Sequence, residues 1–166
     1  MNKKYIKYIE YIVSDIQKPY FKNMEDHYGL KDNEYELVLS KVFNQPVSIK
    51  GNNVHNSNVY NSNGKEIYRE TINGDWIKYE YDDNGNRIYR EGGSGSWIKN
   101  EYDTNGNEIY FESSDGDWIK REYDDNDNKI YQEDSNGDWY KKEYDTNNNE
   151  IYFENTDGVI IDKRYE

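Results

Sequence analysis

Residues 101–145 read EYDTNGNEIYFESSDGDWIKREYDDNDNKIYQEDSNGDWYKKEYD, which is one 21-residue unit given twice with a third begun. The unit runs through most of the chain, and its apolar positions keep the same step throughout. A fixed period of this length predicts a stacked-repeat protein, because so small a unit buries enough apolar surface only against similar neighbours. The aligned positions are Trp76, Trp97, Trp118 and Trp139, and Ile67, Ile88, Ile109, Ile130 and Ile151.

Each unit is predicted to be a β-hairpin, since two runs rich in Ile, Tyr and Trp flank an Asn- and Asp-rich turn. Asn105-Gly106 favours a type I′ turn, in which both central residues have positive φ. Asp127 and Asn148 replace the glycine in the last two units, and Asn and Asp tolerate that conformation best after glycine. A second turn, ending in glycine, leads to the next hairpin. The expected fold is mainly β, an antiparallel meander of about ten short strands in a solenoid-like or single-layer sheet.

A two-residue turn at Asn105-Gly106 would also fix the register of the hairpin. The face that carries Ile98 and Phe111 is the more apolar and is expected to point inward. Because equivalent inward slots hold Arg121 and Lys142, the sheet is expected to be single-layered or only loosely wrapped. The opposite face, with its Trp, Lys and Glu residues, is expected to be held by cross-strand pairs. The expected partners are Tyr102 with Ile109, Glu101 with Tyr110 and Lys99 with Glu112.

The first fifty residues lack the repeat and are predicted to be largely helical. Apolar residues recur at helical spacing over residues 2–17, and Asp32 is placed to cap a second helix. Pro46 then precedes the first strand. We expect residues 1–50 to form a helical cap on a repeat domain spanning residues 51–166, because solenoids need a cap. A specific docking role for the cap is the alternative.

The end of the chain departs from the repeat. Residues 159–166 read VIIDKRYE, with Ile160 in the place of Trp and Asp162 in the place of Lys. This change predicts a terminating strand, or an edge that pairs with a second copy to give a homodimer.

Composition narrows the classes of function. The chain has no Cys and two His, His27 and His55, both outside the repeats. Disulfides and Cys-based zinc sites are thereby excluded, and His-dependent catalysis is disfavoured. Aromatic residues make up 16% of the chain, which argues for an ordered protein despite a mean hydropathy of −1.33. No apolar run is long enough for a membrane span, and no convincing signal peptide precedes the repeats, so the expected location is the cytoplasm.

The repeats resemble a known family. YDDNGNRIY (residues 81–89) and YDTNGNEIY (residues 102–110) are similar to the YD repeat of RHS proteins, and the resemblance covers residues 60–165. RHS proteins are large shells that enclose toxins, and five units cannot enclose anything. The resemblance therefore implies the chemistry of the strands and not the function of a shell. The units also resemble choline- and glucan-binding repeats of cell-wall proteins, and small acidic proteins encoded by phages.

Catalytic and metal sites are not expected. Pairs of carboxylates such as Glu101 and Glu112 recur in every unit, whereas an active site needs one asymmetric arrangement. The Asp and Asn residues of the turns are spaced like calcium ligands. However, the apolar residue and the Glu come seventh and tenth rather than eighth and twelfth as in an EF-hand. Turn chemistry is favoured over calcium, and we expect no enzyme activity and no cofactor.

Charge gives the main functional indication. Residues 59–166 carry 13 basic and 27 acidic side chains, whereas residues 1–58 have a net charge of +1. With strands about 4.8 Å apart, the turns would form two acidic rims along the stacked hairpins. Such a charge array attracts a basic groove made for nucleic acid and repels nucleic acid itself. The expected partner is therefore a basic protein, such as a nucleic-acid-binding nuclease or effector.

These features predict a non-enzymatic interaction or inhibitor protein. Its most specific form is a phage anti-defence protein, anti-CRISPR-like, that acts in the host cytoplasm. One alternative is that the charge only keeps an open sheet soluble. Another is a carbohydrate- or cell-wall-binding module that uses the Trp row. The predicted partner-binding residues are Asp82, Asp83, Asp103, Asp115, Asp117, Asp124, Asp125, Asp127 and Asp145, with Trp97 and Trp118.

Overall fold

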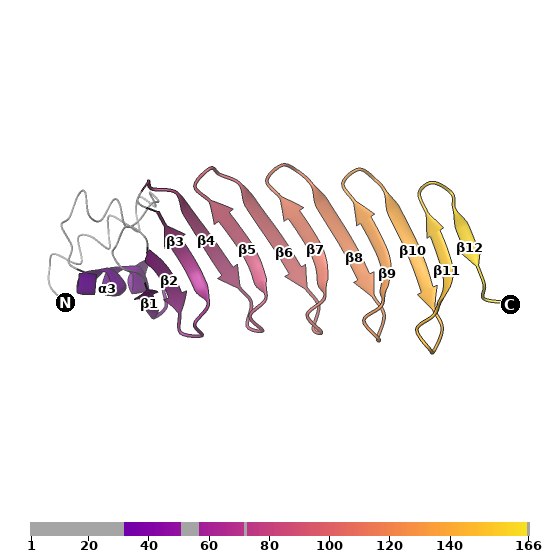
Figure 1. Cartoon of the computed structure of the whole chain (residues 1–166), viewed down its shortest axis with the longest axis horizontal. Helices are drawn as coiled ribbons and strands as arrows, with labels where there is room; N and C mark the ends of the chain where they lie inside the picture. Colours follow the sequence, from indigo (N-terminus) through magenta and orange to yellow (C-terminus); the bar gives the residue numbers. More distant parts are fainter. Residues whose placement is uncertain (1–31, 51–56, 72, 166) are drawn as a thin grey trace. The chain divides into compact units, whose positions relative to one another are not determined.

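The computed structural model describes residues 32–50, 57–71 and 73–165. Within them, twelve β-strands form an antiparallel sheet whose spatial order is the order of the sequence, and a short helix precedes the first strand (Figure 1). The structure confirms the predicted mainly β fold of regular hairpins. The elements are α3 (Asp32–Val42), β1 (Val47–Lys50), β2 (Ser57–Asn61), β3 (Glu66–Glu70), β4 (Trp76–Tyr81), β5 (Arg87–Gly92), β6 (Trp97–Tyr102), β7 (Glu108–Ser113), β8 (Trp118–Tyr123), β9 (Lys129–Asp134), β10 (Trp139–Tyr144), β11 (Glu150–Asn155) and β12 (Ile160–Asp162).

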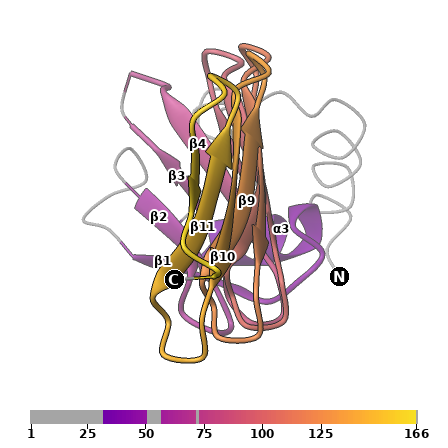
Figure 2. The same ribbon diagram turned by 90° about the vertical axis from the view of Figure 1, so that its right-hand side faces the viewer.

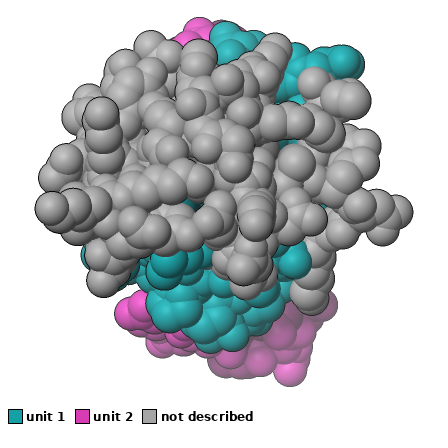
Figure 3. Space-filling view, turned by 90° about the vertical axis from the view of Figure 1, so that its left-hand side faces the viewer, with its two compact units in different colours: residues 1–80, 90–95 teal, residues 81–89, 96–166 magenta. Residues whose placement is uncertain are grey.

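The chain divides into two compact units, which are described separately (Figure 3). The first comprises residues 1–80 with 90–95, and the second comprises residues 81–89 with 96–166. In the first unit, α3 covers the residues predicted for the second helix, and β1 follows Pro46 as expected. The helix expected over residues 2–17, and with it most of the predicted cap, lies outside the described residues.

The first unit holds the apolar core of the described part of the chain. The ring of Tyr68 lies 6.0 Å from that of Phe43 and 6.3 Å from that of Trp76, measured between centroids. The Tyr68 hydroxyl donates to Glu70 at 2.8 Å, so this buried side chain has its polar group satisfied. The buried apolar residues are Val38, Leu39, Val59, Ile67 and Tyr68.

The second unit is a single layer of hairpins, and Figure 2 shows β9, β10 and β11 one behind another. Among its described residues only Asn100, 5% exposed, is buried; the other strand side chains are half-buried or exposed. In the inward slots, Arg121 pairs with Glu108, and Lys142 Nζ lies 2.8 Å from Glu150. Of the two expected arrangements, single-layered or loosely wrapped, the second unit has the single layer. Such a sheet is held by its main-chain ladder and by cross-strand pairs worth about 0.2–1 kcal/mol each.

The turns of the second unit share one geometry, which differs from the prediction. The Gly106 N–H donates to the carbonyl of Asp103 at 3.1 Å, and the Asp103 N–H donates to the carbonyl of Asn107 at 2.9 Å. Gly106 has positive φ, and Asn105 is not among the described residues that do. This is a three-residue loop, a type I turn followed by a left-handed residue. The predicted type I′ turn was wrong, whereas the expected positive φ of Asp127 and Asn148, both 63°, is confirmed.

The longer loop changes the register next to the turn. Glu101 pairs with Tyr110 and Lys99 with Glu112, as predicted. Tyr102 pairs with Glu108 rather than with Ile109, because the register shifts by one residue between Glu101 and Tyr102. The shift is a β-bulge, and it recurs at the equivalent position of β2, β8 and β10. It absorbs the extra loop residue and restores the expected pairing along the rest of each hairpin.

Candidate functional site

The hairpin turns of the second unit lie along its two edges, at the lower and upper sides of the unit in Figure 1. We call the lower set the YD rim, because each of its turns starts at the Asp of a Tyr-Asp pair. We call the upper set the Gly rim. The YD rim consists of residues 82–86, 103–107, 124–128 and 145–149, and the Gly rim of residues 113–117, 134–138 and 155–159.

In the YD rim, the first Asp of each turn caps that turn. Asp103 Oδ1 accepts the backbone N–H groups of Asn105 and Asn107, both at 2.9 Å. Its Oδ2 accepts the side-chain amide of Asn107 at 3.1 Å. The alternate Asp and Asn residues that resembled calcium ligands are thus accounted for by hydrogen bonds within the turn. Asp82, Asp124 and Asp145 accept equivalent bonds.

These hydrogen bonds stabilise the ionised form of the capping carboxylates. The side-chain amides of Asn128 and Asn149 lower the pKa of Asp124 and Asp145, respectively, below the ordinary value for Asp. At Asp82 and Asp103, desolvation raises the pKa, but the bonds donated within the turn outweigh it and the pKa is lowered there too. All four groups therefore remain anionic at neutral pH.

Successive YD turns are also joined to each other. Asp127 Oδ1 accepts the side-chain amides of Asn105 at 2.9 Å and of Asn107 at 2.7 Å, both from the preceding turn. One unit further on, Asn128 Nδ2 donates to Asn148 Oδ1 at 3.0 Å. The residue in the left-handed position of one turn thus accepts from the turn before it, which holds the acidic groups at a regular spacing.

One turn of the Gly rim, residues 134–138, starts with an Asp and has the same kind of cap. Asp134 Oδ1 accepts the backbone N–H groups of Asn136 at 2.9 Å and of Asp138 at 3.3 Å. The other acidic side chains of the Gly rim are exposed to solvent. They are Asp115, Asp117, Asp138 and Asp157.

Charge is strongly segregated between the rims and the strands. The two rims together hold twelve Asp and no Lys or Arg. The rest of the second unit, within residues 81–89 and 96–165, holds nine acidic and nine basic residues. Its net negative charge therefore comes from the rims alone.

Trp side chains line one face of the second unit, at the end of the strands next to the Gly rim. Cross-strand pairing places Trp118 opposite Glu112 and Trp139 opposite Glu133. Lys120 Nζ lies 4.8 Å from the ring centre of Trp118, a cation–π contact. All three Trp side chains of this unit are half-buried.

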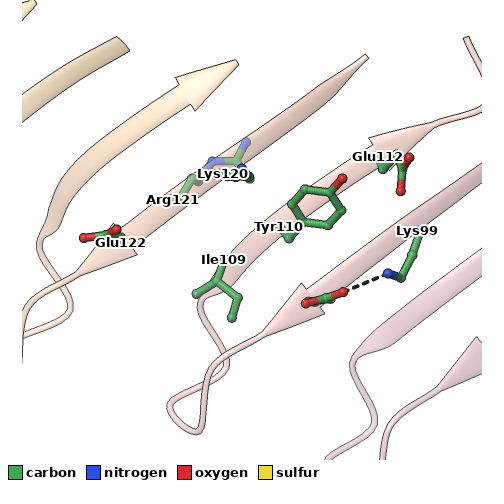
Figure 4. Close-up of a pocket in the computed structure, with 8 residues that line it drawn as sticks. Lys99, Ile109, Tyr110, Glu112, Lys120, Arg121 and Glu122 are labelled. Atoms are coloured by element: carbon green, nitrogen blue, oxygen red, sulfur yellow. Dashed lines mark hydrogen bonds and ion pairs between the residues drawn. The ribbon is translucent and has the colours of Figure 1, made fainter. Parts of the chain in front are cut away.

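Shallow depressions repeat on the same face. One, of about 520 Å³, includes Ile109 and Tyr110 of β7 and is bordered by charged side chains of β6 and β8 (Figure 4). Within it, Lys99 Nζ lies 2.8 Å from Glu101. A second, of about 450 Å³, surrounds Ile130 and Tyr131, one unit further along. The described residues include no group of three His, Asp or Glu side chains placed to hold a metal ion.

The structure thus brings the predicted aspartates together at two edges and places the two predicted Trp residues on a face. Asp115 and Asp117 lie on the Gly rim, and the other predicted aspartates lie on the YD rim. The sequence prediction missed the amides of Asn105, Asn107 and Asn128 that join the turns. The pattern in the sequence that could have indicated these links is the Asn at the end of each YD turn, which recurs with the 21-residue period. From the sequence alone, this Asn is explained by the conformation of its own turn.

No protein-family model matches the chain, and no curated protein does. Among solved structures, the chain is similar to a crystal structure of TcdB2-TccC3-TEV, with 16% identity over 60% of this chain and 5% of that chain, at a TM-score of 0.48. It is also similar to a Tc holotoxin pore of Photorhabdus luminescens, with 13% identity over 68% of this chain and 7% of that one, at a TM-score of 0.49. The chain thus spans a small part of the length of these proteins, and TM-scores below 0.5 define neither a shared fold nor a function. No helix in the described residues is long and apolar enough to cross a membrane.

Proposed function

We propose that the chain is a non-enzymatic interaction protein whose acidic rims bind a basic surface of a partner protein. The partner class is a protein that handles nucleic acid, because its Lys/Arg-rich groove is built for a regular array of negative charge. In the most specific form of the proposal, the chain is a phage anti-defence protein that occupies the nucleic-acid groove of a host nuclease in the cytoplasm, as an anti-CRISPR would.

The observation that carries the proposal is the segregation of charge. A sheet that needed charge only for solubility would serve as well with acidic side chains spread over its faces. In the second unit, the residues outside the rims are neutral overall, and the excess negative charge lies in two rows of turns. A row of one sign produces a directional field that steers a basic partner to it.

The rims also present part of their charge at regular, fixed positions. Turns of one rim recur every second strand, about 9.6 Å apart for strands spaced by about 4.8 Å. Each capping carboxylate accepts at least two hydrogen bonds, so these charges are fixed in place before binding. Fixed charges lose little conformational entropy when a partner binds them.

A nuclease with a strongly positive channel provides the first test. A Cas9-type protein holds its guide–target duplex in such a channel, so purified chain is added to it and binding and DNA cleavage are measured over a salt series. We expect binding that weakens steeply between about 50 and 500 mM salt, inhibition of cleavage, and displacement of the chain by added DNA. Binding that does not depend on salt and is not displaced by DNA would contradict the proposal.

A carbohydrate-binding module is the second candidate, and the half-buried Trp row on one face favours it. Glycan binding would survive high salt and would be lost in Trp97→Ala or Trp118→Ala, because stacked rings supply the contact. Trp97 and Trp118 were predicted to bind the partner together with the aspartates, but neither lies on a rim, so the rim proposal gives them no role in that contact. The same two substitutions should therefore leave salt-sensitive binding to the nuclease unchanged. The pair of measurements therefore separates the two functions.

A further inference from the structure

The last strand reverses a charge pattern that the preceding strands keep. Each of the strands β4, β6, β8 and β10 begins with Trp and carries Lys and Glu two residues apart on the Trp face. The corresponding positions at the end of the chain are Asp162, the last residue of β12, and Arg164, in the turn after it, so both charges are exchanged. The preceding pairs are Lys78 and Glu80, Lys99 and Glu101, Lys120 and Glu122, and Lys141 and Glu143.

Asp162 and Arg164 form an ion pair with each other. Asp162 Oδ2 accepts from the Arg164 guanidinium at 2.6 Å, and Oδ1 accepts from Arg164 Nε at 2.9 Å and from its backbone N–H at 3.1 Å. The guanidinium also lies 4.2 Å from the ring centre of Tyr152 and 3.3 Å from Glu143. Arg164 thus folds back onto the two preceding strands instead of continuing an extended strand.

The outer edge of β12 offers few main-chain groups. The Lys163 N–H donates to the carbonyl of Ile151, and the Val159 carbonyl accepts from Asn155, so these residues bond inward to β11. Since inward and outward groups alternate along a strand, Ile160 and Asp162 point their main-chain groups away from β11. The next outward N–H, that of Arg164, is already bound by Asp162.

The register of the repeat shows which residue of an added strand would lie opposite Asp162. In β6, β8 and β10, the Lys is paired with a Glu of the strand that follows. The pairs are Lys99 with Glu112, Lys120 with Glu133 and Lys141 with Glu154. A strand added to β12 in this register would place its Glu opposite Asp162. Like charges directly opposite each other destabilise a strand pair.

We propose that β12 is a closing strand: the Asp162–Arg164 pair ends the sheet and rejects a further strand of the same repeat, whether from this chain or from a second copy. The replacement of Lys by Asp162 and of Glu by Arg164 removes the complementary Lys that β6, β8 and β10 offer to the next strand and also occupies the last outward N–H. The exposed Ile160 and Ile161, 60% and 44% accessible, then remain on an edge that its own repeat cannot extend.

The test adds a strand to the full chain. Ten residues, TNGNEIYFES, copied from residues 104–113, are appended after Glu166. In the register of the repeat, the second Glu of this extension, the copy of Glu112, lies opposite Asp162. The same extension is made on the double variant Asp162→Lys/Arg164→Glu, which restores the interior pattern. Hydrogen exchange of the outward N–H groups of residues 160 and 162 is compared in four proteins: the unchanged chain and the double variant, each with and without the extension.

We expect the extension to slow exchange at these two N–H groups by about tenfold or more on the double variant, and by less than about twofold on the unchanged edge. Tenfold corresponds to about 1.4 kcal/mol. Equal protection on both edges would overturn the proposal. So would sedimentation that shows the unchanged chain to dimerise through β12, with protection of the same groups at high concentration. Comparison of the two proteins without the extension verifies that the substitutions Asp162→Lys and Arg164→Glu leave the fold intact.

Discussion

Asn107 donates its side-chain amide to Asp127 across two neighbouring turns, with Nδ2 and Oδ1 2.7 Å apart. The same amide donates to Asp103 within its own turn at 3.1 Å. One side chain therefore both closes a turn and links it to the next. Since a single-layer sheet has little buried surface, such links between repeats contribute to keeping the acidic groups in register.

Substitution at Asp127 separates its two roles. Asp127→Ala removes the acceptor and leaves a residue that disfavours the left-handed conformation, which costs about 1–2 kcal/mol for an ordinary L-residue. Asp127→Gly also removes the acceptor but suits the conformation, so we expect it to recover most of that loss. Urea unfolding measures both. If the Gly variant were as unstable as the Ala variant, backbone conformation would not be what this residue supplies.

Loss of a turn cap should destabilise the repeat more than loss of an exposed Asp. Asp103→Ala leaves the N–H groups of Asn105 and Asn107 without their acceptor. Asp125 lies inside a loop and is exposed, so Asp125→Ala is the matched control with the same change in charge. We expect a lower Tm for Asp103→Ala than for Asp125→Ala by calorimetry, and equal Tm values would refute the capping role.

The capping carboxylates also predict how stability depends on pH. Their pKa values are lower in the folded chain than in the unfolded chain, where Asp has a pKa of about 3.9. The unfolded chain therefore takes up protons first as the pH falls. The stabilisation is fully present above about pH 5 and is lost as the pH falls through the folded pKa values.

Urea midpoints measured from pH 7 to pH 2 provide the check. We expect a flat profile above about pH 5 and a continuous fall below about pH 4. Asp103→Asn/Asp124→Asn should flatten this fall, because two of the titrating caps are gone. A midpoint that rose on acidification would mean that repulsion between the rim charges outweighs their hydrogen bonds.

Asn100 is the buried polar residue of the second unit, and its amide character should matter. Its Nδ2 donates to the carbonyl of Arg87 at 3.1 Å, and the residue is 5% exposed. Asn100→Asp replaces the donor with a desolvated carboxylate facing a carbonyl oxygen, at a cost of about 1–3 kcal/mol. Asn84→Asp, in an exposed turn, makes the same charge change and should alter stability by less than about 0.5 kcal/mol. Similar losses in the two variants would show that net charge and not burial is responsible.

Much of this structure could be predicted from the period alone. The positions of Trp97 and Trp118, the turns, and the pairing of Lys99 with Glu112 follow from a step of 21 and from alternation along a strand. The loop length could not be read in this way, because Asn105-Gly106 suits both a type I′ turn and the last two residues of a three-residue loop. The bulge at Tyr102 follows from that choice and was missed with it.

The rims show a similar limit. That aspartates would gather at two edges follows from the hairpin pattern. Which of them cap a turn depends on side-chain rotamers and on the neighbouring turn, and neither has a period of its own in the sequence. Asp82 and Asp83 are adjacent and chemically identical, yet the first accepts the N–H of Asn86 and the second is exposed.

The central claim is that the rims, and not net charge, bind a basic partner. Binding of the Cas9-type nuclease is measured at low salt for Asp83→Asn/Asp125→Asn and for Glu101→Gln/Glu122→Gln. Each variant loses two negative charges, from the rim and from a face, respectively. We predict that affinity falls about fivefold or more for the rim variant and by less than about twofold for the face variant, since a close charge contact is worth about 1 kcal/mol or more. Equal losses in the two variants, or none in the rim variant, would contradict the account.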